Sequence, residues 1–166
     1  MEFLSMADPS DQISEAHRWL VFAEEDLAYG KLGMAGFPRA AAWSFQQAAE
    51  KAFKSLLIFK GQTPRRTHDL LALFNSIVAL SADLEKLRAD VLCLAELAAS
   101  SRYPDDLAPI EKPEIEKFAE SAQAIVVRVR LDLNDGRAEG GGRRTGDGKE
   151  ERLKVGKLKL GKGGVV

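Results

Sequence analysis

The segment Phe45–Leu57, which reads FQQAAEKAFKSLL, lies inside a longer run from Pro38 to Lys60 and decides the fold. Its apolar residues recur every three or four positions, which on a helix places them in one stripe that can enter a core. The stripe comprises Phe45, Ala49, Ala52, Leu56 and Phe59, and the opposite, polar face carries Gln47, Lys51 and Lys54 with Trp43 beside them. We therefore expect the face with Trp43 and Gln47 to meet a partner, most simply the second subunit of a homodimer.

The same helical period extends along most of the chain. Pro38 suits the first turn of a helix, because its missing N–H needs no partner there, and Gly61 can close that helix in a left-handed conformation. Thr67 and Ser81 are predicted N-caps. The predicted helices span residues 10–32, 38–60, 68–80, 82–100 and 114–133, although β-branched residues at 126–133 also suit a strand. The sequence thus predicts an all-α protein, an up-and-down bundle of four to five helices.

The distribution of charged residues and glycines divides the chain into two parts. Residues 1–134 hold 15 basic and 20 acidic residues, whereas residues 135–166 hold 9 and 5, together with ten of the 14 glycines. The acidic body lacks the overall basic footprint of a broad DNA-binding surface. The second part has too little apolar surface to offset the entropy of ordering it. We expect a helical domain at 1–134 and a flexible Gly/Lys/Arg-rich tail at 135–166.

Several functional classes lack their signatures. Cys93 is the only cysteine, so no disulfide or Cys/His zinc site is expected, and a buried, apolar role is predicted for it. No apolar run is long enough to cross a bilayer, and the first residues do not resemble a secretion signal. Gly140–Gly142 lacks the lysine and hydroxyl residue of a phosphate loop. We expect a cytoplasmic protein with no metal, cofactor or membrane partner.

Basic residues surround the predicted start of the third helix. Arg65, Arg66 and His68 lie where unpaired backbone N–H groups and the helix dipole favour an anion, so a phosphate would fit there. The alternative is a solvated basic turn in which His68 caps or packs locally. The residues themselves leave both interpretations open.

Two further positions suit a nucleotide. Arg102 could hold a phosphate with its guanidinium fork while the ring of Tyr103 stacks on a base. Equally, Arg102 could bind the open carbonyls that end the fourth helix, with Tyr103 folded over the core.

Glu50 and Lys54 have the spacing of a routine surface ion pair, which leaves Lys51 freer to face a ligand.

Four motifs in order resemble the HEPN domain family, named for higher eukaryotes and prokaryotes nucleotide binding. They are Asp26-Leu27, the block Gln46–Leu57, Thr67-His68-Asp69-Leu70 and Ser101-Arg102-Tyr103-Pro104-Asp105. The resemblance covers about residues 10–133. It implies a helical bundle, usually dimeric, that is often encoded or fused with a minimal nucleotidyltransferase in toxin–antitoxin-like pairs.

One departure from the family bears on catalysis. Many HEPN ribonucleases carry an arginine followed four to six residues later by a histidine, but neither His17 nor His68 has an arginine at that distance before it. We therefore assign no catalytic residues and favour the non-ribonuclease branch, in which Lys51, Arg65, Arg66, His68, Arg102 and Tyr103 bind nucleotide or RNA. The alternatives are a protein–protein interaction module with no nucleotide ligand, and a degenerate ribonuclease that uses His68 with Arg102.

Overall fold

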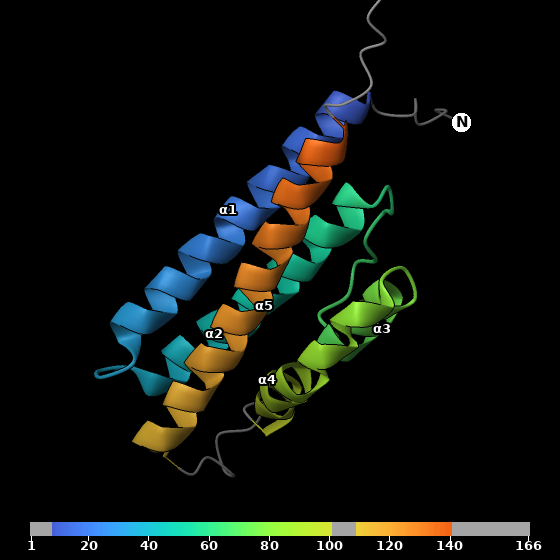
Figure 1. The fold of residues 1–166 in the computed structure, drawn as a ribbon. Helices are drawn as coiled ribbons and strands as arrows, with labels where there is room; N and C mark the ends of the chain where they lie inside the picture. The colour runs from blue at the N-terminus through green and yellow to red at the C-terminus, as the bar shows by residue number, and fades with distance from the viewer. Residues whose placement is uncertain (1–7, 101–108, 141–166) are drawn as a thin grey trace, which may run out of the picture.

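The computed structural model describes residues 8–100 and 109–140, with side chains at 8–96 and 109–135. In chain order its elements are α1 (Pro9–Gly33), α2 (Pro38–Phe59), α3 (Leu70–Val78), a 3-10 helix η1 (Ala82–Leu87), α4 (Arg88–Ser100) and α5 (Lys112–Gly140). Helices α1, α2 and α5 lie side by side, while α3 and α4 pack against α2 on the side away from α1 (Figure 1). The described residues contain no strand, and the predicted all-α bundle is confirmed.

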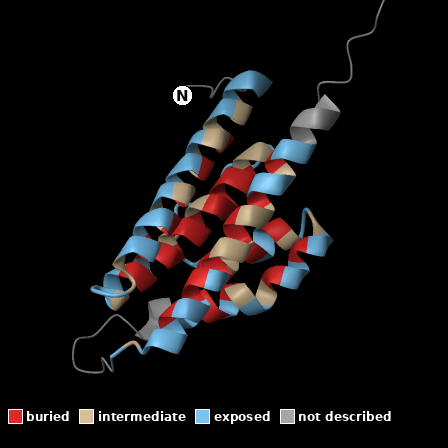
Figure 2. Cartoon of the chain, turned by 60° about the vertical axis from the view of Figure 1, so that its left-hand side comes forward, coloured by how far each residue is buried: buried red, intermediate tan, exposed pale blue. Residues whose placement is uncertain are grey.

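Helix α2 is the centre of the bundle. It packs against α1, α3, α4 and α5, and fourteen of its 22 residues are buried. Figure 2 shows buried residues running along the inner helices while exposed residues cover the outer faces. The expected apolar stripe is buried at Phe45, Ala49, Ala52 and Leu56. The expected polar face is only partly exposed, however, because neighbours cover the helix on several sides: Trp43 is exposed, whereas Lys54 is only 9% exposed.

Small residues bring α1 close to α2. Gly30 of α1 faces the ring of Phe45, and a Cβ on this glycine would lie 2.6 Å from that ring. One turn after another of α1 contributes Ala16, Ala23 and Leu27 to the core, as the sequence pattern predicts. The hydroxyl of Ser55 donates a 2.7 Å hydrogen bond to the carbonyl of Ala16. Close backbone approach thus fixes the α1–α2 pair.

The end of α2 follows the prediction and sets up the next segment. Gly61 has φ of +76°, the left-handed conformation that suits glycine. Its N–H bonds to the carbonyl of Ile58 at 2.9 Å, and the N–H of Gln62 bonds to Leu57 at 2.9 Å. These two bonds satisfy carbonyls that the helix leaves open at its C-terminus. They also turn the chain back so that Gln62 lies over Leu57.

The start of α3 differs from the prediction. The N-cap is Asp69, whose carboxylate accepts the N–H of Ala72 at 3.0 Å. Thr67, two residues before this N-cap, instead accepts the N–H of Asp69 at 3.0 Å with its hydroxyl oxygen. The predicted N-cap at Thr67 is therefore wrong, because the aspartate two positions later is the one placed to accept from the first turn. His68 consequently lies outside the helix.

The second half of the bundle also differs in detail. Residues 82–87 form a 3-10 turn before α4, and Ser81 donates its hydroxyl to Asp83 rather than capping the backbone. Arg128 of α5 pairs with Asp83 and, at 2.9 Å, with Asp132, which anchors η1 to α5. The Arg128 guanidinium beside Asp83 holds the pKa of that carboxyl below its ordinary value of 3.8.

Helix α5 is longer than predicted. It continues past residue 133 to Gly140, and the stretch 126–133 is helical rather than extended. Buried Val126, Val129 and Leu133 explain this, because on a helix they share the face toward the core. No helix among the described residues combines the length and apolar character that crossing a bilayer requires.

Candidate functional site

A polar cluster lies inside the bundle on one side of α2. Glu50 and Lys54 form an ion pair of 2.8 Å, with side chains only 3% and 11% exposed. The amide of Gln46 lies 3.5 Å from the other Glu50 oxygen. Positions 46, 50 and 54 follow one another by single turns, so they form one row along the helix. The interpretation of Glu50 and Lys54 as a routine surface pair is wrong, because the surrounding elements bury both charges.

Two side chains from other segments contact this cluster. His68 reaches Glu50 from the chain after α2, with Nδ1 at 3.2 and 3.3 Å from the two carboxylate oxygens. The ammonium of Lys54 lies 5.6 Å from the centre of the Trp19 ring on α1, a geometry that attracts a cation to the ring face. We call Gln46, Glu50 and Lys54 the buried polar cluster, which His68 and Trp19 contact from outside α2. It joins α1, α2 and the segment that leads to α3.

That segment, residues 60–69, is the connector. It is held at one end by the turn at Gly61 and at the other by His68, whose own side chain is 84% exposed. Arg65 and Arg66 lie between these two anchors and are exposed. Neither arginine forms an ion pair with any residue that the structure describes. The connector thus presents two guanidinium groups from a tethered loop.

The anion site expected at the start of α3 is partly filled. Asp69 already places its carboxylate on the first turn of that helix, so an external phosphate there would compete with a covalently attached acceptor. The side chains of Arg65 and Arg66 remain available. An anion is therefore better placed against the connector than on the axis of α3.

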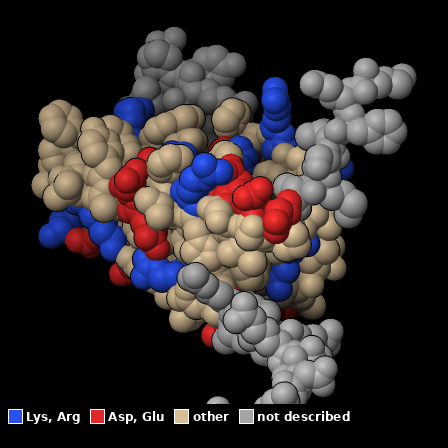
Figure 3. Space-filling model, turned by 90° about the horizontal axis from the view of Figure 1, so that it is seen from above, with Lys and Arg blue, Asp and Glu red and all other residues tan. Residues whose placement is uncertain are grey.

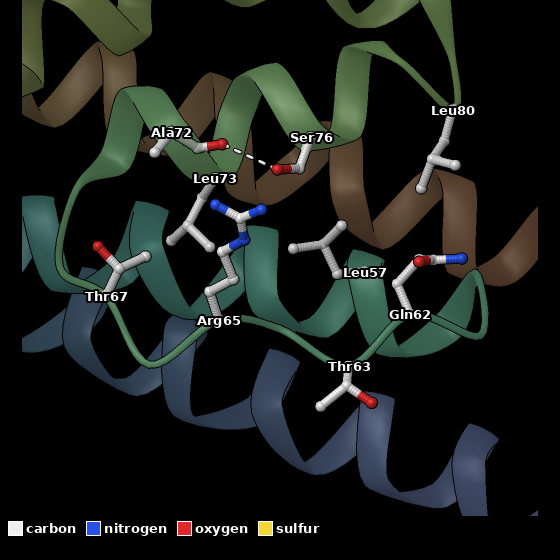
Figure 4. Close-up of a pocket in the computed structure, with 9 residues that line it drawn as sticks. All are labelled: Leu57, Gln62, Thr63, Arg65, Thr67, Ala72, Leu73, Ser76 and Leu80. Carbon is white, nitrogen blue, oxygen red and sulfur yellow. Dashed lines mark hydrogen bonds between the residues drawn. The ribbon is translucent and has the colours of Figure 1, made fainter.

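A cleft of about 210 Å³ lies between the connector, α2 and α3. Figure 4 shows Arg65 extending across it from the connector toward α3. Apolar side chains supply much of the lining, namely Leu57, Ala72, Leu73 and Leu80. The polar lining consists of Gln62, Thr63, Arg65, Thr67 and Ser76. No carboxylate is among these nine residues, so the cleft offers one positive charge and several neutral hydrogen-bonding groups.

The remaining predicted residues on α2 have other surroundings. Lys51 forms an ion pair with Asp26 of α1, and both side chains are 28% exposed. The expectation that Lys51 is free to face a ligand is wrong for this structure, because that carboxylate occupies it. Gln47 is half-buried and donates to Gln46 at 2.7 Å. Trp43 is 55% exposed, so the aromatic expected at an interface does reach the surface.

Arg102 and Tyr103 lie outside the described residues, so their placement beside His68 stays a prediction.

On the face seen in Figure 3, lysine and arginine side chains are mixed with aspartate and glutamate. No group of three potential metal ligands occurs within the described ranges. Cys93 is buried there, as predicted. The candidate site is therefore a local basic loop on a mixed surface.

The comparisons with known proteins identify the family. The model of the HEPN domain matches residues 16–131, which is more than half of the chain. The chain belongs to the HEPN domain family. Among solved structures, the HEPN chain is similar to the crystal structure of TT1696 from Thermus thermophilus, with 28% identity and a TM-score of 0.60. That match covers 70% of this chain and 96% of the other. A search of the curated proteins finds no match.

Sequence reasoning missed the role of Gln46 and Glu50 in this HEPN domain. Their signal was the four-residue spacing of Gln46, Glu50 and Lys54, which continues one polar row through a stretch rich in alanine, phenylalanine and leucine. A polar row flanked by apolar residues on both sides is typical of groups that satisfy one another inside a protein. His68 was found, but its carboxylate partner was not.

Proposed function

We propose that this HEPN domain is a nucleotide- or RNA-binding accessory module of the non-ribonuclease branch. It acts as a homodimer and pairs with a minimal nucleotidyltransferase in a toxin–antitoxin-like system. The observation that carries the proposal is the connector, which presents Arg65 and Arg66 without ion-pair partners among the described residues. Guanidinium forks bind phosphate oxygens two at a time, so such a loop suits a phosphorylated ligand.

The buried polar cluster supports this function by holding the connector. Glu50 is fixed on α2 by Lys54 at 2.8 Å, and it accepts a hydrogen bond from His68 at the end of the connector. A tethered loop loses less conformational entropy on binding than a free one. His68 is thus assigned to the site as the residue that positions the loop.

Two further residues belong to the proposed site on the basis of the family resemblance. Arg102 would supply a further guanidinium and Tyr103 a ring for stacking on a base. Lys51 is left outside the site, because its ammonium already has Asp26 as a partner. The site is therefore assembled from the connector and the segment after α4.

Isothermal titration calorimetry with ATP, GTP and a short single-stranded RNA tests the proposal. The double variant Arg65→Ala/Arg66→Ala should weaken binding about tenfold or more, since a hydrogen bond to a charged group contributes ~1.5–3 kcal/mol. The matched control Lys86→Ala/Lys117→Ala removes the same charge from η1 and α5 and should leave the affinity unchanged. Absence of binding by all three ligands would reject the proposal.

The pairing with a nucleotidyltransferase has a separate test. Where a minimal nucleotidyltransferase is encoded beside this gene, co-expression of the two proteins should give a complex that stays together during gel filtration. If the two proteins elute separately at micromolar concentration, the paired system is rejected while nucleotide binding stands.

A second candidate function is a protein–protein interaction module without a nucleotide ligand. It is favoured by Trp43, which is 55% exposed although it lies on the most buried helix of the domain. Aromatic side chains are enriched at interfaces. On this hypothesis Trp43→Ala lowers the molecular mass measured by sedimentation, whereas Arg65→Ala changes nothing. Nucleotide or RNA binding in calorimetry that Arg65→Ala weakens would favour the nucleotide-binding function instead.

A further inference from the structure

The cleft beneath Arg65 differs in chemistry from a phosphate site. Its lining includes Leu57 from α2 and Leu73 and Leu80 from α3. A phosphate gains nothing from contact with leucine side chains, because burying a charge against apolar groups is costly. The apolar part of the lining favours an uncharged group, and the polar part favours one that carries hydrogen-bonding atoms. The positive charge of Arg65 alone therefore does not define the chemistry of the ligand.

The polar rim adds hydrogen-bonding capacity of both kinds. The oxygen of Thr67 accepts the N–H of Asp69, which leaves its O–H free to donate. Ser76 donates its O–H to the carbonyl of Ala72 at 3.0 Å, which leaves its oxygen free to accept. Gln62 can do both with its amide. A flat ring with donors and acceptors on its edge matches this rim.

We propose that this cleft binds a single nucleobase, with the ring between the guanidinium of Arg65 and the leucine side chains. This inference rests on the proposed function and names the part of the ligand that the cleft takes. Arginine planes stack on unpaired bases in RNA recognition. At about 210 Å³ the cleft is smaller than pockets for drug-sized ligands, which span ~300–1,000 Å³. It therefore holds one base, while the attached phosphate faces Arg66 outside.

The test fills the cleft without touching the charges. Ser76 is exposed and lines the cleft, so Ser76→Leu places an apolar side chain inside it on a helix that tolerates leucine. Asn75→Leu is the matched control, because Asn75 is exposed on the same helix and does not line the cleft. Arg65→Lys keeps the charge but removes the planar group that stacks.

Fluorescence anisotropy with a labelled RNA hexamer and with an abasic hexamer of the same phosphates measures the contribution of bases. The natural protein should bind the RNA about tenfold or more tightly than the abasic strand, the range expected for base stacking. Ser76→Leu and Arg65→Lys should remove most of this difference, and Asn75→Leu should keep it. Competition by AMP and UMP, compared with ribose 5-phosphate, distinguishes a free nucleotide from an RNA strand as the source of the base.

The outcomes separate this inference from the proposed function. Equal binding of the RNA and abasic strands, or a base preference that Ser76→Leu leaves intact, overturns the base site while nucleic-acid binding stands. Failure of every probe to bind overturns both. Loss of the preference in Ser76→Leu, with normal helicity by circular dichroism, supports the cleft as the base site.

Discussion

The buried pair of Glu50 and Lys54 leads to the most demanding prediction. Their side chains are 3% and 11% exposed, so solvent screens neither charge well. Removing one partner of a buried pair leaves the other charge uncompensated, which costs ~3–5 kcal/mol in comparable proteins. Glu50→Leu should therefore lower the free energy of unfolding by ~3–5 kcal/mol, because Lys54 and Gln46 lose their acceptor and His68 loses its anchor.

Replacing Lys54, the other partner of the pair, should lower the free energy of unfolding by less. In Lys54→Met the carboxylate of Glu50 keeps His68 and Gln46 as partners, so we expect a loss of ~1–3 kcal/mol, as for one unsatisfied polar group. The double variant Glu50→Leu/Lys54→Met should recover much of the loss, since apolar replacement of a buried pair is often neutral or stabilising. The double variant should thus cost less than the sum of the two single losses by ~3 kcal/mol or more, at or above the upper end of coupling energies between residues in contact.

Urea unfolding followed by circular dichroism at 222 nm gives these free energies for all four proteins. Arg18→Ala serves as the control, because Arg18 pairs with Glu15 at the surface with 71% and 41% exposure and should change stability by only tenths of a kcal/mol. Losses below ~1 kcal/mol for both single variants, adding without coupling, would match a surface pair. That result would refute the buried polar cluster.

Three other predictions concern packing and pH. Gly30→Ala should destabilise the protein by ~1–3 kcal/mol in thermal or urea unfolding, because overpacking outweighs the better helix propensity of alanine. The added Cβ would lie 2.6 Å from the Phe45 ring. A stabilised variant would contradict the close approach of α1 and α2. Gly61→Ala should cost ~1–2 kcal/mol, because Gly61 has φ of +76°, and an unchanged midpoint would show that the left-handed turn is not required. Arg128 holds the pKa of Asp83 below its ordinary value of 3.8. The ion pair therefore stabilises the fold above pH 3.8, and this stabilisation is lost as the pH falls through the lowered pKa of Asp83. The difference in urea midpoint between Asp83→Asn and the natural protein should therefore be present at pH 6 and shrink below pH 3.8; a difference that does not change with pH would exclude the ion pair as its cause.

Local rules account for much of what the sequence predicted. Pro38 begins α2 and Gly61 follows its end, because each position depends on the backbone chemistry of one residue. The period of Ala16, Leu20 and Ala23 identified the inner face of α1, because that helix has one exposed side. The ends and the buried face of such a helix can therefore be predicted from its own residues.

The start of α3 needed information from elsewhere in the chain. Thr67 and Asp69 are both good N-cap residues, and local preference does not choose between them. In the structure Asp69 takes the cap, and His68 stays outside the helix, where it reaches Glu50. That contact joins residues 18 positions apart, so a pattern confined to the connector could not reveal it.

The polar face of α2 shows how far periodicity can mislead about a site. A helical pattern identifies which residues share a face, but not how many neighbours the helix has. Because α2 is covered by other elements on several sides, Glu50 and Lys54 are buried and satisfy each other instead of meeting solvent. The groups left free for a ligand are therefore on the connector, which this buried pair holds through His68. Of the predicted site residues, Lys51 on α2 is therefore paired with Asp26, whereas Arg65 and Arg66 on the connector keep their charges unpaired among the described residues.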